Sequence, residues 1–139
     1  MPDVNVLVAA YRTDDQRHDD VRSWLEEAVN GPEVVGLSDT VAAGFLRVVT
    51  HPRIFATPTP LEQALTQLES LGAADGVVRV NPGRSFPAVL ARVCREADAR
   101  GNLVSDAANA ATAIEAGATW VSLDRDFVRF AGLAWTVPV

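Results

Sequence analysis

Aspartates in this sequence stand where apolar runs end or helical patterns begin. Five of them are candidates for chemistry: Asp3, Asp39, Asp106, Asp124 and Asp126. In open α/β sheets ligands collect at the carboxyl ends of strands, so a parallel sheet can bring such side chains to one rim. Clustered carboxylates repel one another unless cations neutralise them, and oxygen ligands without Cys or His favour magnesium or manganese over zinc. The pattern therefore predicts a divalent-cation site that activates water.

Asp3 is the most unusual of these residues, because the β-branched run VNVLV follows it at once. We expect residues 3–8 to form a buried strand. A carboxylate there loses hydration, at a cost of several kcal/mol in roughly the worst case, unless a cation or donors compensate it. Asn5 is two residues further on, and therefore on the same face of such a strand. The sequence predicts that Asn5 supports Asp3.

Each carboxylate also has an ordinary structural explanation. Asp39 and Asp106 can cap helices, and Asp124 and Asp126 can shape the turn after a strand. Asp3 can be an exposed chain end. Perturbed carboxylates are common in structural networks as well. The functional interpretation rests on the joint pattern, since all of these residues fall at element boundaries.

Alternating apolar runs and helical patterns define the elements that must position these side chains. Expected strands cover residues 3–8, 33–37, 77–80, 119–123 and 133–137. Expected helices cover residues 15–30, 39–49, 60–72, 86–99 and 105–117, and one helical turn is expected within 124–130. The order predicts an α/β class of fold, with a central, mainly parallel sheet of about five strands flanked by helices on both faces.

Local signals mark several helix ends. Ser38 or Asp39 can cap the helix that follows. Thr59, Pro60 and Glu62 have the spacing of a capping box with proline at the first helical position. Gly117 has the place of a helix C-terminal cap.

Bulk composition describes one soluble globular domain, residues 1–139, with 48% hydrophobic and 22% charged residues. No apolar run approaches the roughly 20 residues of a membrane span, and the start lacks the pattern of a signal peptide, so we expect a cytoplasmic protein. The single Cys94 lies among apolar residues and is expected to pack in the core.

The charged residues exclude several classes of protein. A net charge of −6 argues against coating nucleic acid by charge alone, but not against reaching phosphates through metal ions. All twelve basic residues are arginine, which excludes phosphate-loop NTPases and receiver domains, because both need a lysine. The sequence AYRTDD after residue 8 lacks the glycines of a dinucleotide-binding turn.

Three segments together resemble the PIN-domain ribonucleases, specifically the VapC toxins of toxin–antitoxin pairs. They are DVNVLVAAYRTDDQRHDDVRSWL at 3–25, FLRVVTHPRIF at 45–55 and GNLVSDAANAATAIEAGATWVSLDRDFVRF at 101–130. The resemblance covers nearly the whole chain. It implies a magnesium- or manganese-dependent endoribonuclease, usually a homodimer, inhibited by a cognate VapB-type antitoxin whose C-terminal segment occupies the active-site groove.

The resemblance also implies roles for single residues. Asp3 matches the acid of the first strand, Asp106 the acid that opens the late helix and Asp124 the acid after the fourth strand, with Asp126 as its neighbour. These four are the implied metal ligands. Asn5 matches an amide that supports the first acid by hydrogen bonding, and Ser122 stands where the family often has Thr or Ser.

The second acid of the family pattern is missing from this sequence. Many PIN domains carry a Glu inside the second helix, at the position of Gly44. In a subset of similar sequences an acid stands at the helix start, which makes Asp39 the candidate. The alternative is a site that is one ligand short, and therefore a weak or silent PIN-like module that binds a protein or RNA partner without cleavage.

Substrate RNA must be held by an acidic protein, and arginine suits this task because its planar fork grips phosphate. The arginines nearest in sequence to the expected rim are Arg12, Arg17, Arg47, Arg53 and Arg125. Salt bridges with Asp and Glu are an equally good explanation for each of them. No histidine is required, and His18 and His51 are expected to have surface or structural roles.

Overall fold

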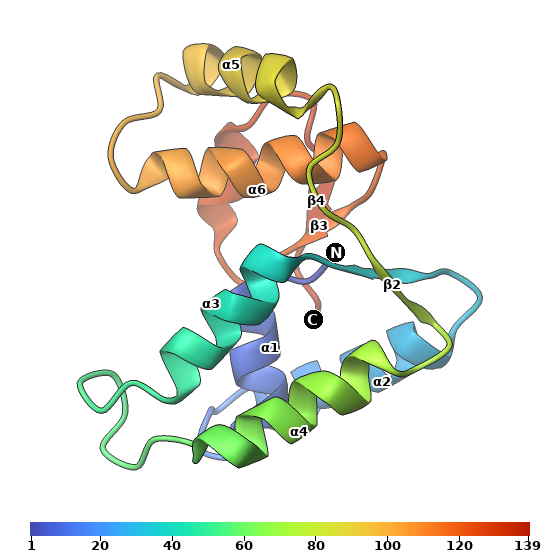
Figure 1. Cartoon of the computed structure of the whole chain (residues 1–139), viewed down its shortest axis with the longest axis vertical. Coiled ribbons are helices and arrows are strands. Elements are labelled where there is room, and N and C mark those ends of the chain that lie inside the picture. Colours follow the sequence, from blue (N-terminus) through green and yellow to red (C-terminus); the bar gives the residue numbers. More distant parts are fainter.

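The computed structural model describes all 139 residues (Figure 1). Its helices are α1 (Val4–Tyr11), α2 (His18–Asn30), α3 (Asp39–Val49), α4 (Leu61–Gly72), α5 (Phe86–Ala97), α6 (Leu103–Ala116) and the 3-10 helix η1 (Arg125–Arg129). Its strands are β1 (Val35–Leu37), β2 (Val77–Arg79), β3 (Trp120–Val121) and β4 (Trp135–Thr136). None of the helices is long and apolar enough to cross a membrane.

All strand pairs are parallel, which confirms the α/β class. β1 pairs with β2, with Val35 opposite Val77, and β3 pairs with β4, with Trp120 opposite Trp135. The N-terminal residues extend the second pair through a single parallel bridge between Pro2 and Val121. A count of five strands is not confirmed, because the chain forms two two-stranded sheets and this bridge.

The expected strand at residues 3–8 is wrong, because residues 4–11 form helix α1. Strand-like pairing ends at Asp3, whose backbone N–H donates to the Val121 carbonyl at 2.8 Å. Asp3 has extended backbone angles and caps the helix, and its side chain accepts from the Val4 N–H. Burial overrides the β-branched preference of this run, since Val6 and Leu7 are fully enclosed by neighbouring helices.

The remaining helix signals were confirmed at some ends and wrong at another. Ser38 caps α3 by accepting from the Val41 N–H, and Gly117 ends α6 with a φ of 64°. The capping box at Thr59 does not form, since Pro60 is the N-cap of α4 and no side chain caps it. The Thr59 hydroxyl instead accepts a hydrogen bond from Arg12 at 3.2 Å.

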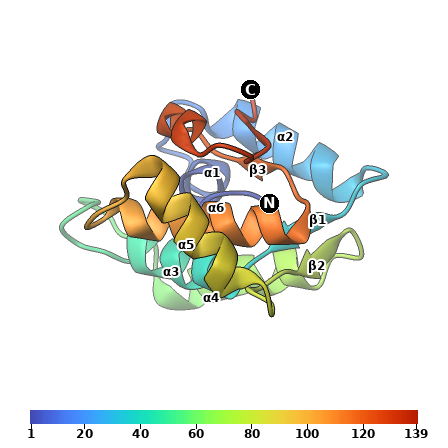
Figure 2. The same ribbon diagram turned by 90° about the horizontal axis from the view of Figure 1, so that it is seen from above.

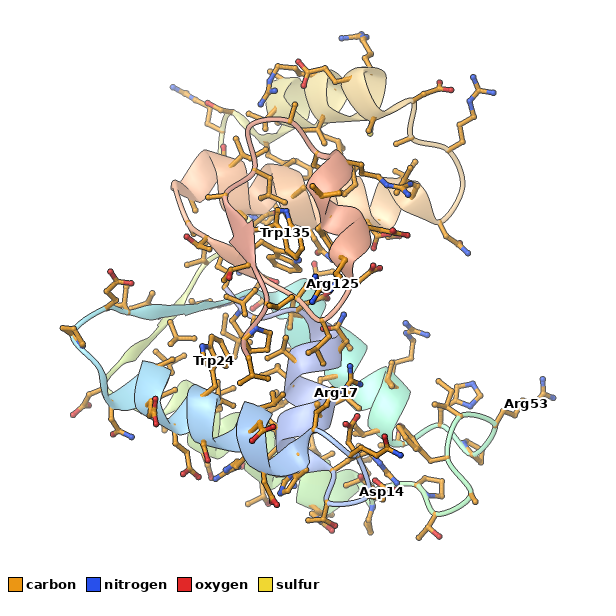
Figure 3. The ribbon with its side chains drawn as sticks, turned by 180° about the vertical axis from the view of Figure 1, so that it is seen from behind. Asp14, Arg17, Trp24, Arg53, Arg125 and Trp135 are labelled. Carbon is orange, nitrogen blue, oxygen red and sulfur yellow. The ribbon has the colours of Figure 1, made fainter.

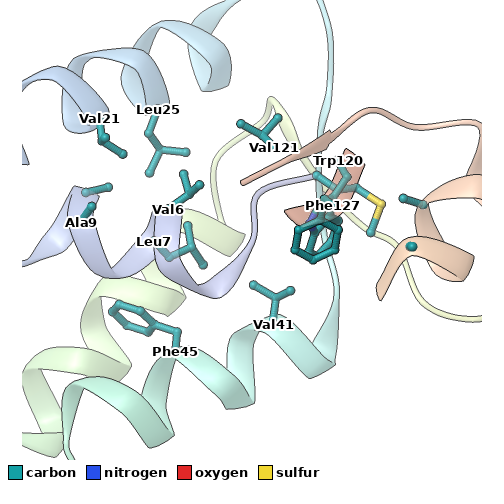
Figure 4. Packing of buried hydrophobic residues seen from close by; sticks show 14 of the residues in the cluster. Val6, Leu7, Ala9, Val21, Leu25, Val41, Phe45, Trp120, Val121 and Phe127 are labelled. Carbon is teal, nitrogen blue, oxygen red and sulfur yellow. The ribbon is translucent and has the colours of Figure 1, made fainter. Parts of the chain in front are cut away.

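Figure 1 shows α5 and α6 packed together in one half of the molecule and α1 to α4 in the other, with the short strands between them. Seen from above, α5 crosses in front of α6 (Figure 2). The core is a single cluster of 21 buried hydrophobic residues. In that cluster α1 lies between α2 and α3, so that Val6 and Leu7 meet Leu25 on one side and Phe45 on the other (Figure 4). The start of α1 is therefore held firmly in place.

Candidate metal and catalytic site

Asp3 is buried at the junction of the N-terminal bridge, α1 and the end of β3. Its side chain is tied on both oxygens: Oδ1 accepts from the Val4 N–H at 2.7 Å, and Oδ2 accepts from Ser122 Oγ at 2.7 Å and Asn5 Nδ2 at 3.0 Å. The residue is 8% exposed. These donors offset part of the free-energy cost of removing the carboxylate from water, and they fix the direction in which it points.

Ser122 and Asn5 form one network that joins α1 to the loop after β3. The Ser122 hydroxyl accepts from Asn5 Nδ2 and from the Asp124 N–H, both at 3.0 Å, while it donates to Asp3. The side-chain oxygen of Asn5, Oδ1, accepts from the Leu123 N–H at 3.0 Å. Asn5 therefore contacts Asp3 as predicted, although it does so from the first turn of a helix and not from one face of a strand.

Asp124 follows Ser122 by two residues and is the N-cap of η1. Its Oδ1 accepts from the Asp126 N–H at 2.8 Å, so Asp124 shapes the turn as its structural explanation requires. Both Asp124 and Asp126 are nevertheless exposed, so their carboxylates remain accessible. Shaping a turn and binding a cation are compatible here, since a carboxylate has more acceptor positions than the turn uses.

The charges of these side chains act on one another. Burial raises the pKa of Asp3, and the nearby Asp106 and Asp124 carboxylates raise it further, against the lowering effect of the Ser122 and Val4 donors. Burial also raises the pKa of Asp106, with additional repulsion from Asp124 and Asp126. Asp3, Asp106 and Asp124, from the start of α1, from α6 and from the end of β3, are therefore near enough for Asp106 and Asp124 to act on the charge of Asp3.

Arg129 is a cation of this region that the sequence patterns did not single out. Its guanidinium pairs with the Asp126 carboxylate at 3.6 Å, and its positive charge lowers the pKa of Asp106. The signal that could have identified it is the spacing of three residues from Asp126, which places two side chains on the same side of a helical turn.

The donor set suits a hydrated oxygen-binding cation. No three carboxylate, imidazole or thiol groups enclose one ion directly. Magnesium, however, usually keeps several waters and is bound by one or two carboxylates, so a full protein cage is not needed. Neighbouring acids with raised pKa values fit a positive charge, and the lack of Cys and His among them fits magnesium or manganese.

Asp39 is not brought into this group. Its carboxylate forms a bidentate ion pair with Arg79, at the end of β2, and its backbone N–H donates to the Asn81 side chain at 2.9 Å. The Arg79 guanidinium lowers the pKa of Asp39. The acids of the cluster have no part in that shift, whereas they do act on Asp3 and Asp106.

Gly44 has a structural reason to lack a side chain. A Cβ atom added there would lie 2.7 Å from Val4 Cγ2, which is closer than packed atoms approach. Any side chain at this position therefore requires Val4 to shift. The same contact holds α3 against the residue that follows Asp3.

Two cavities lie away from the candidate acids. The larger, of about 570 Å³, has Gly31 and Val34 among its lining residues. The smaller, of about 360 Å³, opens between α2 and α4, and Tyr11, Arg22 and Leu71 are among its lining residues. The candidate acids therefore belong to neither of these two cavities.

Comparison with known proteins places the chain in a family. The family model of the PIN domain matches residues 1–133. Ribonuclease VapC43 of Mycobacterium tuberculosis (strain H37Rv) is 44% identical over 137 residues, which cover 99% of this chain and 93% of that protein. Ribonuclease VapC25 of the same strain is 40% identical over 131 residues, covering 94% of this chain and 92% of that protein.

Solved structures show the same fold at low sequence identity. VapBC2 from Rickettsia felis, bound to a DNA fragment from its promoter, matches with a TM-score of 0.75 and 19% identity over 99% of this chain and 96% of that chain. VapBC-1 from nontypeable Haemophilus influenzae matches with a TM-score of 0.68 and 16% identity over 99% and 96%. From its sequence and its fold alike, this chain belongs to the PIN-domain family.

Proposed function

We propose that this protein is a metal-dependent endoribonuclease that acts in the cytoplasm as the toxin of a toxin–antitoxin pair. The observation that carries the proposal is the buried Asp3, held by Ser122 and Asn5, whose pKa is raised by burial and by the nearby Asp106 and Asp124 carboxylates. Full-length similarity to VapC ribonucleases supports the same activity. The proposed metal ligands are Asp3, Asp106, Asp124 and Asp126, with Asn5 and Ser122 as their support.

The residues divide the work according to their contacts. A bound magnesium or manganese ion supplies a water of lowered pKa and neutralises charge on the phosphate. Asp3 is held rigidly by Ser122 and Asn5, so it fixes the position of the site. Asp106 forms no hydrogen bond with another side chain, so its carboxylate is free to accept the proton of an attacking water.

Cleavage assays on the purified protein test this proposal. The protein, freed of any partner, is mixed with structured RNA and manganese or magnesium, and is compared with Asp3→Ala and Asp106→Ala. We expect cleavage that stops with a chelator and falls strongly in both variants. Cleavage that survives both substitutions would remove the assigned site.

A silent PIN-like module is the second candidate, and Gly44 is the observation that favours it. With Asp39 paired to Arg79, the site has one acid fewer than the usual family pattern. Under this candidate the parent protein cuts no RNA with either metal, while still binding a protein or RNA partner. Asp39 remains the proposed replacement for the missing acid, and that role requires its ion pair with Arg79 to break.

A VapB-type antitoxin is the proposed protein partner. The structural relatives are VapBC complexes from two bacteria, and the fold match covers nearly the whole of this chain. We also expect the free protein to be a homodimer, which light scattering on the purified protein measures directly.

A further inference from the structure

The arginines of this chain fall into two groups, according to whether a carboxylate holds them. Those in ion pairs are Arg12, Arg17, Arg22, Arg79, Arg92, Arg100 and Arg129. Those with neither an ion pair nor a side-chain hydrogen bond are Arg47, Arg53, Arg84, Arg95 and Arg125. The members of the second group are all exposed, so their guanidinium groups are free to bind an external anion.

Arg125 belongs to the acidic site by its position in the chain. It stands between Asp124 and Asp126 at the start of η1. Figure 3 shows its side chain where η1 meets α1. A phosphate beside the acids would therefore find a free guanidinium next to it.

Arg47 projects from the same side of α3 as Gly44. The two residues are three apart in one helix, so they share a face, and Gly44 is pressed against Val4 at the start of α1. Side chains on a helix tilt toward its N-terminus, which directs Arg47 back toward the turn that contacts α1. Arg47 therefore lies about one helical turn beyond the contact of Gly44 with Val4.

Arg53 lies on the segment 51–60, here called the arm, which connects α3 to α4. In Figure 1 the arm projects beyond the end of α3, and Figure 3 shows Arg53 at its outer edge. Helix α3 has 11 residues and is therefore about 16 Å long. Arg125, Arg47 and Arg53 follow one another from the acids, along α3, to the arm.

Arg12 holds the arm in place through contacts with several of its residues. Its side chain is only 7% exposed and pairs with Asp14. It donates to Thr59 Oγ1 and to the Thr57 carbonyl, both at 3.2 Å, and its guanidinium carbon lies 3.6 Å from the centre of the Phe55 ring. A buried arginine with this many partners fixes the arm and is not free to bind phosphate.

We infer that Arg125, Arg47 and Arg53 bind the phosphates of a single strand of RNA and lead it into the acidic site, while Arg12 is a positioning residue that keeps Arg53 in line. The inference rests on the proposed ribonuclease function, for which it names the substrate-binding side chains. Guanidinium groups suit this task, because their fork binds phosphate oxygens in pairs. The local concentration of free arginine on this side also explains how an acidic protein attracts RNA.

Salt-dependent binding of a short, labelled single-stranded RNA in EDTA tests the inference without relying on cleavage. Arg125→Gln, Arg47→Gln and Arg53→Gln are each expected to weaken binding roughly threefold to tenfold and to reduce the slope of log affinity against log salt by about 0.7. The matched controls are Arg84→Gln and Arg95→Gln, which remove equally free arginines near or on α5, on the far side of α6 from α3. The controls are expected to leave the slope unchanged.

Arg12 has its own test, because Arg12→Gln is expected to lower RNA affinity only through Arg53. The double variant Arg12→Gln/Arg53→Gln should then bind RNA no more weakly than Arg53→Gln alone. Thr59→Val removes one contact of Arg12 and serves where Arg12→Gln fails to fold. In Arg12→Gln and in Thr59→Val, faster trypsin cleavage after Arg53 is the expected sign that the arm is more mobile.

Several outcomes overturn the inference. Equal losses in all five single variants show attraction by overall charge, and no loss in any of them shows that RNA lies elsewhere. Loss of antitoxin binding with RNA binding intact assigns these arginines to a protein interface. Cleavage by the parent protein is scored separately, so the proposed function can stand when this inference fails.

Discussion

Helices α1 and α3 both begin beside an aspartate, and the two carboxylates are satisfied in opposite ways. Asp3 is buried and has only neutral donors, and other carboxylates lie near it, so its pKa is raised. Asp39 is exposed and has a guanidinium partner, so its pKa is lowered. Asp39 is already neutralised by its ion pair with Arg79. The acids around Asp3 still carry excess negative charge after Arg129 pairs with Asp126, and a bound cation would compensate that charge. The position of its partners, and not the residue type, distinguishes a candidate metal ligand from a surface ion pair.

Replacing Asp3 by Asn is expected to have the largest effect on this contrast. The substitution keeps the shape and removes the charge, so metal-dependent cleavage should fall about a hundredfold or more. Gel assays of RNA cleavage over a manganese titration measure the loss. The exposed Asp75→Asn is the matched control, and an Asp3→Asn protein as active as the parent would exclude Asp3 from catalysis.

The pH dependence of stability sharpens the same point. The folded pKa of Asp3 is raised above its ordinary value of 3.8, so ionisation costs the metal-free fold stability once the pH exceeds that value, and the cost is complete above the raised pKa. The stability of the metal-free parent should therefore rise as the pH falls from neutral toward about 4, and by more than that of Asp3→Asn. Thermal melts of both proteins in EDTA measure the difference, and parallel pH profiles would contradict it.

Removing the Ser122 hydroxyl is expected to have the next largest effect. Ser122→Ala leaves Asp3 without its 2.7 Å donor and the Asp124 N–H without an acceptor, at a cost of about 1–3 kcal/mol in unfolding free energy. Manganese affinity should fall about 10- to 100-fold, because the support of the ligands is lost. Ser23→Ala on the exposed side of α2 is the control. Equal stability of Ser122→Ala and the parent would show that the network carries little energy.

Sequence patterns predicted the contact between Asp3 and Asn5, but not the element that carries it. The position of Asp3 before an apolar run was visible, and so was its pairing with Asn5, but the run forms a helix and not a strand. The local preference of VNVLV for strand is outweighed by burial between α2 and α3, which only the assembled fold supplies. The parallel strands at 35–37 and 77–79 were predicted within one or two residues, because apolar runs between helices are a strong local signal.

Contacts between distant side chains were beyond prediction. The pairing of Asp39 with Arg79 joins residues 40 positions apart, and the sequence around neither residue indicates this contact. The Thr59 capping box failed for a similar reason, since the hydroxyl is taken by Arg12 from 47 positions away. Sequence spacing describes what a side chain can do locally, whereas the fold decides which of several partners it meets.

Gly44 offers a test of why α3 supplies no internal acid. Gly44→Ala should destabilise the fold by about 1–2 kcal/mol, because the overlap with Val4 exceeds the gain in helix propensity. Val4→Ala makes room for the new methyl group, so the double variant should lose less stability than the two single losses combined. Urea unfolding of the four proteins measures this coupling, and additive losses would show that the helices do not meet at this point.

The ion pair of Asp39 is expected to give the smallest effects. Arg79→Gln should leave the melting temperature unresolved from that of the parent, since exposed ion pairs contribute little to stability. If Asp39 acts at the edge of the site once released, Arg79→Gln should raise manganese affinity up to about threefold, and Asp39→Asn should lower the cleavage rate roughly threefold to tenfold. Calorimetric titration with manganese and single-turnover cleavage separate binding from rate. An Asp39→Asn protein that cuts at the parent rate would leave Asp39 with a structural role at the start of α3. Asp3, Asp106, Asp124 and Asp126 would then suffice for cleavage.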